Sequence, residues 1–103
     1  MASDNPIETG ADDDPTRPAF CTKEEWEAFK EFIGLSKRHA EVVGLKVQGK
    51  QEKEIQEILE ISGSTVRDHL YESCDRLSAS NVKEIPYRVF EAIWHMKQPP
   101  RQK

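Results

Sequence analysis

Residues 52–77 decide the fold, and they read EKEIQEILEISGSTVRDHLYESCDRL. A short helix is predicted over about 52–59, with an apolar face made of Ile55, Ile58 and Leu59. A longer helix is predicted over about 63–77, because apolar residues follow one another there at helical spacings: Val66, Leu70, Cys74 and Leu77. The residues between the two helices leave room only for a tight turn, and Ser62 is a good N-cap for the second helix.

Two more helices are predicted before this pair. Residues 22–25 (TKEE) form a capping box, and the helix that it opens has one apolar stripe: Trp26, Phe29 and Ile33. Gly34 is a natural stop for that helix. Ser36 can cap the next helix, which Gly49 ends, and its inward residues are Ala40, Val43 and Val47.

One more helix is predicted after the pair. It starts somewhere in 82–86, because Pro86 is tolerated only in a first helical turn, and it frays after His95. We expect it to bury Val89, Phe90 and Ile93, with Trp94 as a further candidate. No stretch of useful length alternates with a period of two. The predicted fold class is therefore all-α, a small bundle of four to five helices.

The ends of the chain differ in composition from this helical part. Residues 1–20 hold three prolines and few groups that can be buried, so they cannot offset a backbone ordering cost of roughly 1–2 kcal/mol per residue. We expect residues 1–21 to be a disordered acidic leader, 22–97 the helical domain and 98–103 a flexible tail. A chain of 103 residues has room for one such domain.

Charge and composition narrow the function classes. The formal net charge is −4, but residues 1–34 hold three cations against nine anions, so the remainder carries a net +2. No apolar run approaches the roughly 20 residues that cross a bilayer, and the acidic N-terminus is not a signal peptide. We therefore expect no membrane partner and a cytoplasmic location.

Two helices joined by a tight turn, the second opened by a serine, form the helix-turn-helix arrangement. The run Leu35-Ser36-x-Arg38-x-x-Glu41, then Gly49, Lys53-Glu54-Ile55 and Ile61-Ser62, then Thr65-Val66-Arg67-x-His69-Leu70, resembles the LuxR/FixJ (GerE-type) DNA-binding domain. The resemblance covers about sixty residues. It implies that 35–97 is a LuxR-type core, that 22–34 is an extra N-terminal helix, and that the chain is a bacterial transcription regulator with double-stranded DNA as partner.

The resemblance also assigns contact residues. The recognition helix, about 63–77, would enter the major groove, with bases contacted by Arg67, Asp68 and Tyr71. Phosphates would be contacted by Lys50, Lys53, Thr65 and Arg76. In this family the last helix often pairs two domains, and here the apolar residues Tyr87, Phe90 and Trp94 offer a homodimer surface. Part of that surface can instead dock the extra N-terminal helix.

Three positions depart from the family pattern: Glu60 stands where glycine is usual, Gln56 where a small alanine is usual, and Ser73 where a large aliphatic residue is usual. The recognition helix also carries two arginines against three acidic residues, a net charge of −1, where family members generally present a positive helix. The alternative is therefore a protein-protein interaction module on the same fold, with weak or no DNA binding.

The sequence gives little support for catalysis or for metal binding. No nucleophile and orienting acid accompany a histidine in a recognisable spacing, so we expect no enzyme. Cys21, Cys74, His39 and His95 show no ligand spacing such as C-x-x-C or H-x-x-x-H, and no glycine-rich phosphate loop is present. We expect no metal, no cofactor and no small-molecule ligand.

Overall fold

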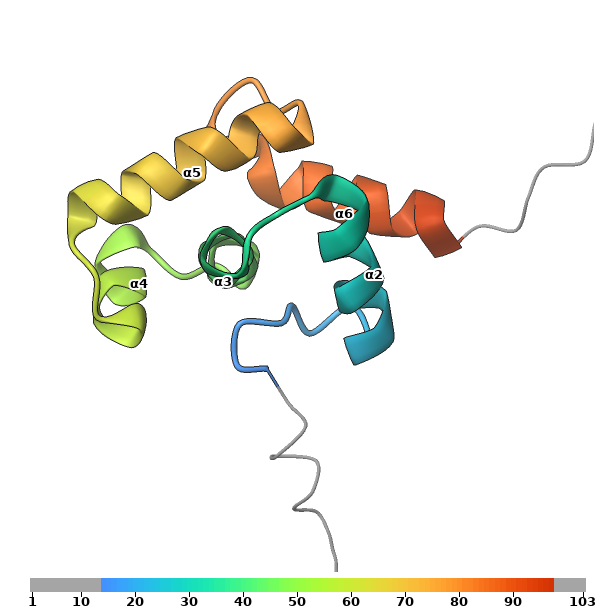
Figure 1. The fold of residues 1–103 in the computed structure, drawn as a ribbon, viewed down its shortest axis with the longest axis horizontal. Coiled ribbons are helices and arrows are strands. Elements are labelled where there is room, and N and C mark those ends of the chain that lie inside the picture. Colours follow the sequence, from blue (N-terminus) through green and yellow to red (C-terminus); the bar gives the residue numbers. More distant parts are fainter. Residues whose placement is uncertain (1–13, 98–103) are drawn as a thin grey trace, which may run out of the picture.

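The computed structural model describes residues 14–97, and every regular element in that range is helical (Figure 1). The α-helices are α2 (Lys23–Ile33), α3 (Lys37–Val47), α4 (Glu52–Leu59), α5 (Gly63–Leu77) and α6 (Ile85–Lys97), with a 3₁₀ turn η1 (Val82–Glu84) before the last. The all-α prediction is confirmed. The predicted disorder of residues 1–13 and the flexible tail 98–103 lie outside the described residues.

The helix starts are fixed by local capping. Thr22 Oγ1 accepts from the backbone N–H of Glu25, whose carboxylate accepts from the N–H of Thr22, so the predicted capping box is present. Ser36 and Ser62 cap α3 and α5 by accepting from the N–H groups of His39 and Thr65. These three caps explain why the predicted starts agree with the structure.

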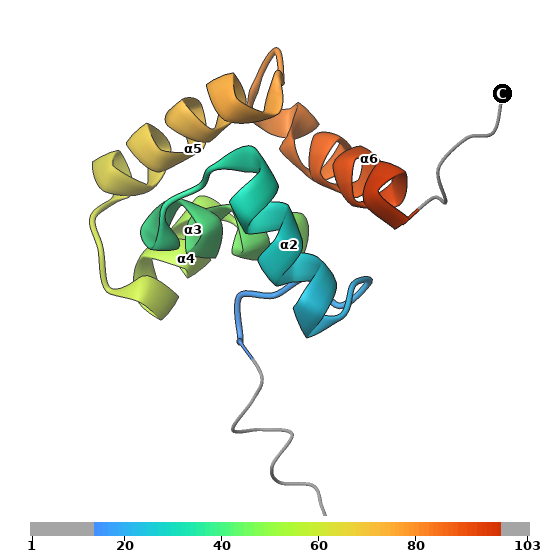
Figure 2. The same ribbon diagram turned by 45° about the vertical axis from the view of Figure 1, so that its right-hand side comes forward.

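Helix α3 is the centre of the fold (Figures 1 and 2). It packs against α4, α5 and α6, and α2 packs against α6. The core takes its side chains from all five helices, and the largest fully buried ones are Trp26, Phe29, Leu45, Ile55, Leu70, Ile85 and Ile93. The extra N-terminal helix is thus part of the domain, held through its predicted stripe.

Two predicted core residues are not buried. Ile58 is 46% exposed on α4 and Phe90 is 49% exposed on α6, and the further candidate Trp94 is 52% exposed. The buried residues of each helix form a narrower stripe beside these exposed positions. They are Ile55 in α4 and Val89 and Ile93 in α6. A small domain covers only one side of such short helices, so an apolar residue at the stripe's edge stays exposed. Helix α6 also continues past His95 to Lys97.

Residues 14–21 correct the predicted leader, because they are packed onto the helices. Thr16, Pro18 and Cys21 are buried. Gln48 Nε2, at the end of α3, donates to the carbonyl oxygens of Pro15 (2.9 Å) and Arg17 (3.1 Å). The composition of residues 1–20 indicates disorder, but these long-range contacts hold the last part of that stretch against α3.

Gly44 makes this packing possible. A Cβ at this position of α3 would lie 1.8 Å from the carbonyl oxygen of Thr16 and 3.1 Å from the Trp26 ring. The backbone of the N-terminal segment therefore lies directly on the backbone of α3, where only glycine leaves enough space.

Candidate nucleic-acid interface

Helices α4 and α5 form the predicted helix-turn-helix. Ile55, Val66 and Leu70 are fully buried between these helices and α3, which fixes the angle of α5. The turn is closed by Glu60, which adopts a left-handed conformation (φ 57°) and donates its N–H to the carbonyl of Gln56. The chain thus has a glutamate at this position of the turn, where the family pattern has glycine.

Of the two other departures from the family pattern, Gln56 has a complementary neighbour and Ser73 does not. Gln56 lies against the start of α5, where a Cβ on Gly63 would be 2.9 Å from the glutamine Nε2. The side chain therefore fits because position 63 has none. Ser73 is fully buried, and its Oγ has no hydrogen-bond partner among the described residues.

The predicted base-contact residues share the exposed side of α5. Arg67 and Asp68 are exposed, and Tyr71 is 60% exposed one turn later. The guanidinium of Arg67 lies 3.6 Å from the carboxylate of Glu52, at the start of α4. The structure thus brings these three side chains together and adds an acidic partner that sequence analysis did not find.

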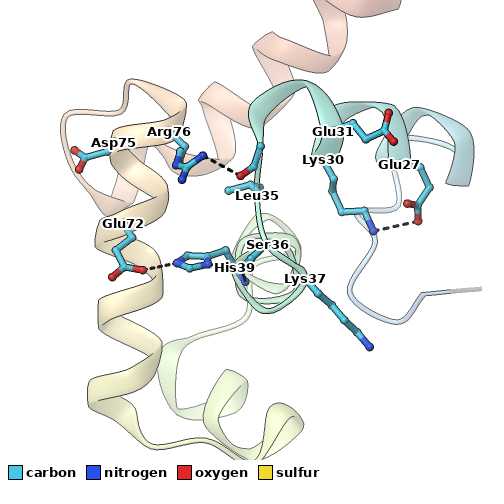
Figure 3. Close-up of a pocket in the computed structure, with 11 residues that line it drawn as sticks. Glu27, Lys30, Glu31, Leu35, Ser36, Lys37, His39, Glu72, Asp75 and Arg76 are labelled. Atoms are coloured by element: carbon cyan, nitrogen blue, oxygen red, sulfur yellow. Dashed lines mark hydrogen bonds and ion pairs between the residues drawn. The ribbon is translucent and has the colours of Figure 1, made fainter.

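The predicted phosphate contacts do not form one group. Lys53 is exposed on α4 and Lys50 is half-buried in the loop before it. Thr65 Oγ1 lies 2.9 Å from Ser62 Oγ, so it is part of the cap of α5. Arg76 lies nine residues after Arg67, or about 13 Å along the helix axis. It donates to the carbonyl of Gly34 at 3.0 Å (Figure 3).

A polar groove of about 710 Å³ lies beside this end of α5. Figure 3 shows its walls, which come from α2, the α2–α3 connection, the first turn of α3 and the second half of α5. A hydrogen bond between His39 and Glu72 crosses from α3 to α5 at its edge. Lys30 pairs with Glu27 on the α2 side at 3.1 Å.

A histidine cluster continues inward from this edge. The rings of His39 and His69 meet edge to face with centroids 4.5 Å apart. Burial, reinforced by the neighbouring His39, lowers the pKa of His69. Sequence analysis missed this cluster because His39 and His69 are thirty residues apart and on different helices.

The predicted dimer surface is exposed on α6. Tyr87, Phe90 and Trp94 are 60%, 49% and 52% exposed. The Phe90 ring contacts Trp94 (centroids 6.4 Å apart) and Phe20 of the N-terminal segment (5.5 Å). Docking of α2 on α6 therefore leaves this aromatic patch uncovered. No helix within residues 14–97 has the length and apolar character needed to span a membrane.

Comparison with known proteins identifies the family. The sequence profile described as GerE, bacterial regulatory proteins of the LuxR family, matches residues 34–87. This range begins at the end of α2 and includes α3, α4, α5 and the first residues of α6. No curated protein and no solved structure matches the chain. Because the profile spans more than half of the sequence, the chain belongs to the LuxR family of bacterial regulatory proteins, through a helix-turn-helix domain of the DNA-binding type.

Proposed function

We propose that this protein is a transcription regulator that binds double-stranded DNA with α5 in the major groove. The observation that carries the proposal is the division of α5 into two faces. One face is buried in the core and carries Val66, Leu70 and Cys74. The other face is exposed and carries Arg67, Asp68 and Tyr71. A helix held in this way presents its N-terminal half to base edges, as recognition helices do.

Each exposed side chain has a role that its chemistry permits. Arg67 can donate two hydrogen bonds to a guanine, and Asp68 can accept from the amino group of a cytosine. We assign phosphate contacts first to Lys50, Lys53 and Thr65, which lie at the α4–α5 end. The Nη1 group of Arg76 is bonded to the Gly34 carbonyl, so a phosphate would be contacted by its other guanidinium N–H groups.

The charges limit the affinity of a single domain. Only cations neutralise phosphates, so if three or four of the basic residues Lys50, Lys53, Arg67 and Arg76 do so, log affinity should fall with log salt at a slope near −3. The acidic residues of α5 and the Arg67–Glu52 pair oppose the phosphates, so one domain should bind in about the micromolar range at physiological salt.

Fluorescence anisotropy with mixed genomic fragments tests the proposal, over a salt series starting from low salt. Arg67→Ala should weaken binding by about 1–3 kcal/mol if the side chain reads a guanine, and by less if it meets only phosphate. Asp68→Asn should tighten non-specific binding, because it removes a like charge from the DNA-facing surface. Absence of salt-dependent binding, with no effect of either substitution, overturns the proposal.

In that event the second candidate, a protein-protein interaction module, takes its place. It is favoured by the net charge of −1 on α5 and by the partial neutralisation of Arg67. Such an interface need not release counterions, so the salt series separates the two functions.

We further propose that two copies pair through α6. The patch of Tyr87, Phe90 and Trp94 is larger than a lone terminal helix needs. Pairing there would place two recognition helices about one DNA turn apart. A regulator of this kind acts in the bacterial cytoplasm and is not an enzyme.

A further inference from the structure

We propose that His39, His69 and Glu72 bind one divalent transition-metal ion of the zinc class. Among residues 14–97 this is the one group of three possible ligands whose ligand atoms all lie within 4.8 Å of one another. His39 is in the first turn of α3, and His69 and Glu72 are one turn apart on α5. A bound ion would therefore join the recognition helix to the central helix. The inference does not depend on DNA binding.

The ligand set fits the chemistry of such an ion. Two imidazoles and one carboxylate bind zinc at about 2.0–2.2 Å, so ligand atoms around a tetrahedral ion lie about 3.4 Å apart. In the structure the ligand atoms are at most 4.8 Å apart, so each pair must approach by no more than about 1.4 Å to bind the ion. Glu72 is 64% exposed, so its side chain can make that movement without disturbing the core.

The contact between His39 and Glu72 already brings two ligand atoms face to face. The Nε2 atom of His39 faces a carboxylate oxygen of Glu72, and in this hydrogen bond the imidazole donates its proton to the carboxylate. A metal ion takes the place of that proton, which is released to solvent.

Neighbouring groups prepare the imidazoles for this role. His39 Nδ1 lies 2.5 Å from Ser36 Oγ, and a histidine ligand is usually oriented by an oxygen at its second ring nitrogen. The Nδ1 atom of His69 is buried without a hydrogen-bond partner among the described residues. A metal ion bound at this cluster would supply a polar partner for the His69 ring, which lies between two helices.

The fourth coordination position is open to the groove. His39 and Glu72 both line it, so an ion held there could take a water molecule or an external ligand from that side. The two cysteines are buried elsewhere and do not belong to the cluster.

The test is a titration of the full chain, freed of metal by a chelator, with Zn²⁺ and with Co²⁺. We expect one ion per chain and a visible Co²⁺ spectrum without thiolate charge-transfer bands. At about 100 times the dissociation constant, Zn²⁺ should raise the melting midpoint by about 10–20 °C. His39→Gln and Glu72→Gln should each weaken binding by more than about 100-fold, beyond the loss seen when an outer partner of a ligand is removed.

His95→Gln and Glu57→Gln are the matched controls, because both residues are exposed and lie outside the cluster. They should leave the affinity unchanged. The proposal is overturned if the wild type binds neither ion at micromolar concentration, or if Glu72→Gln binds as the wild type does. Circular dichroism shows whether each variant is folded; if His39→Gln is not, the exposed Glu72 position decides the outcome.

Discussion

Two residues other than glycine occupy the left-handed region of backbone space among residues 14–97, Glu60 (φ 57°) and Ser78 (φ 59°). Each ends a helix of the helix-turn-helix, α4 and α5 respectively. A side chain in this conformation costs about 1–2 kcal/mol, because its Cβ lies close to the following carbonyl oxygen. The domain therefore carries strain at both ends of its recognition helix.

Glu60→Gly should relieve this strain. The expected gain in unfolding free energy is about 0.5–1 kcal/mol, since the greater freedom of glycine in the unfolded chain offsets part of the relief. Urea denaturation measures it. Glu60→Ala is the control, because it removes the carboxylate from the C-terminus of α4 and keeps the Cβ. An equal gain in both variants would assign the effect to charge.

Gly44→Ala should destabilise the domain, because the new Cβ would overlap the carbonyl oxygen of Thr16. Overpacking of this kind costs about 1–3 kcal/mol, against a gain of up to about 1 kcal/mol in helix propensity. Gly63→Ala is the comparison, since its Cβ meets only the movable end of Gln56. Thermal melts of both variants check this: similar midpoints would mean that the segment around Thr16 does not lie on α3.

The residues that sequence analysis placed correctly act through local spacing. Caps such as Ser36 and Ser62 satisfy N–H groups within three residues, so a pattern in the sequence suffices to find them. His39 could not be connected to His69 in this way, nor Arg67 to Glu52, because these pairs form only when helices pack. The sequence thus predicts the helix caps and the exposed side of α5, and does not predict the partners that these side chains gain when the helices pack.

At the scale of elements, the ion pair between α4 and α5 lies at the proposed DNA surface. Glu52 and Arg67 are 39% and 51% exposed, so the pair contributes at most about 1 kcal/mol to stability. It would weaken DNA binding by a similar amount, because the carboxylate would compete with DNA for the same guanidinium.

Glu52→Gln should therefore tighten DNA binding and leave the melting midpoint almost unchanged. An increase of about 3–10-fold in affinity at low salt corresponds to a gain of about 1 kcal/mol, the size expected for an exposed pair. Anisotropy titrations measure it. Glu57→Gln removes the same charge from an exposed position of α4 that makes no ion pair within the described residues. If both variants bind equally, net charge alone explains the change.

The segment 14–21 shows where prediction from composition ends. Prolines and acidic residues indicate that it cannot build a core of its own, and that reasoning is sound for an isolated stretch. The segment is ordered because Gly44 of α3 leaves room for its backbone and because Gln48 donates hydrogen bonds to its carbonyl oxygens. Neither feature is visible in the segment itself.

Removing this segment should cost stability. A chain starting at residue 21 should melt about 5–10 °C below one starting at residue 14, because burial of Thr16 and Pro18 is lost and the Trp26 region is uncovered. Because both truncated chains lack residues 1–13, their comparison measures the contribution of residues 14–20 alone. Identical midpoints in differential scanning calorimetry would show that residues 14–20 contribute nothing to the fold.

At the scale of the whole molecule, α3 lies between α4 and α6 (Figure 1). The proposed DNA surface on α4 and α5 and the aromatic patch on α6 are therefore separate. Pairing through α6 would leave the exposed face of α5 free. The family profile covers α3, α4 and α5, whereas the α2–α6 packing that shapes the patch depends on residues before position 34.

We expect dimerisation through the patch of Phe90 and Trp94, favoured because the exposed rings bury apolar surface on association. Sedimentation velocity should show a mass that rises with protein concentration, and Phe90→Ala with Trp94→Ala should abolish the rise. Phe32→Ala is the matched control: Phe32 is the most exposed aromatic residue in the described part of the chain, at 73%, and lies on α2. A strict monomer up to high micromolar concentration, with and without DNA, rules the dimer out. DNA binding would then rest on one domain, and its affinity would stay at the micromolar level expected from three or four phosphate contacts.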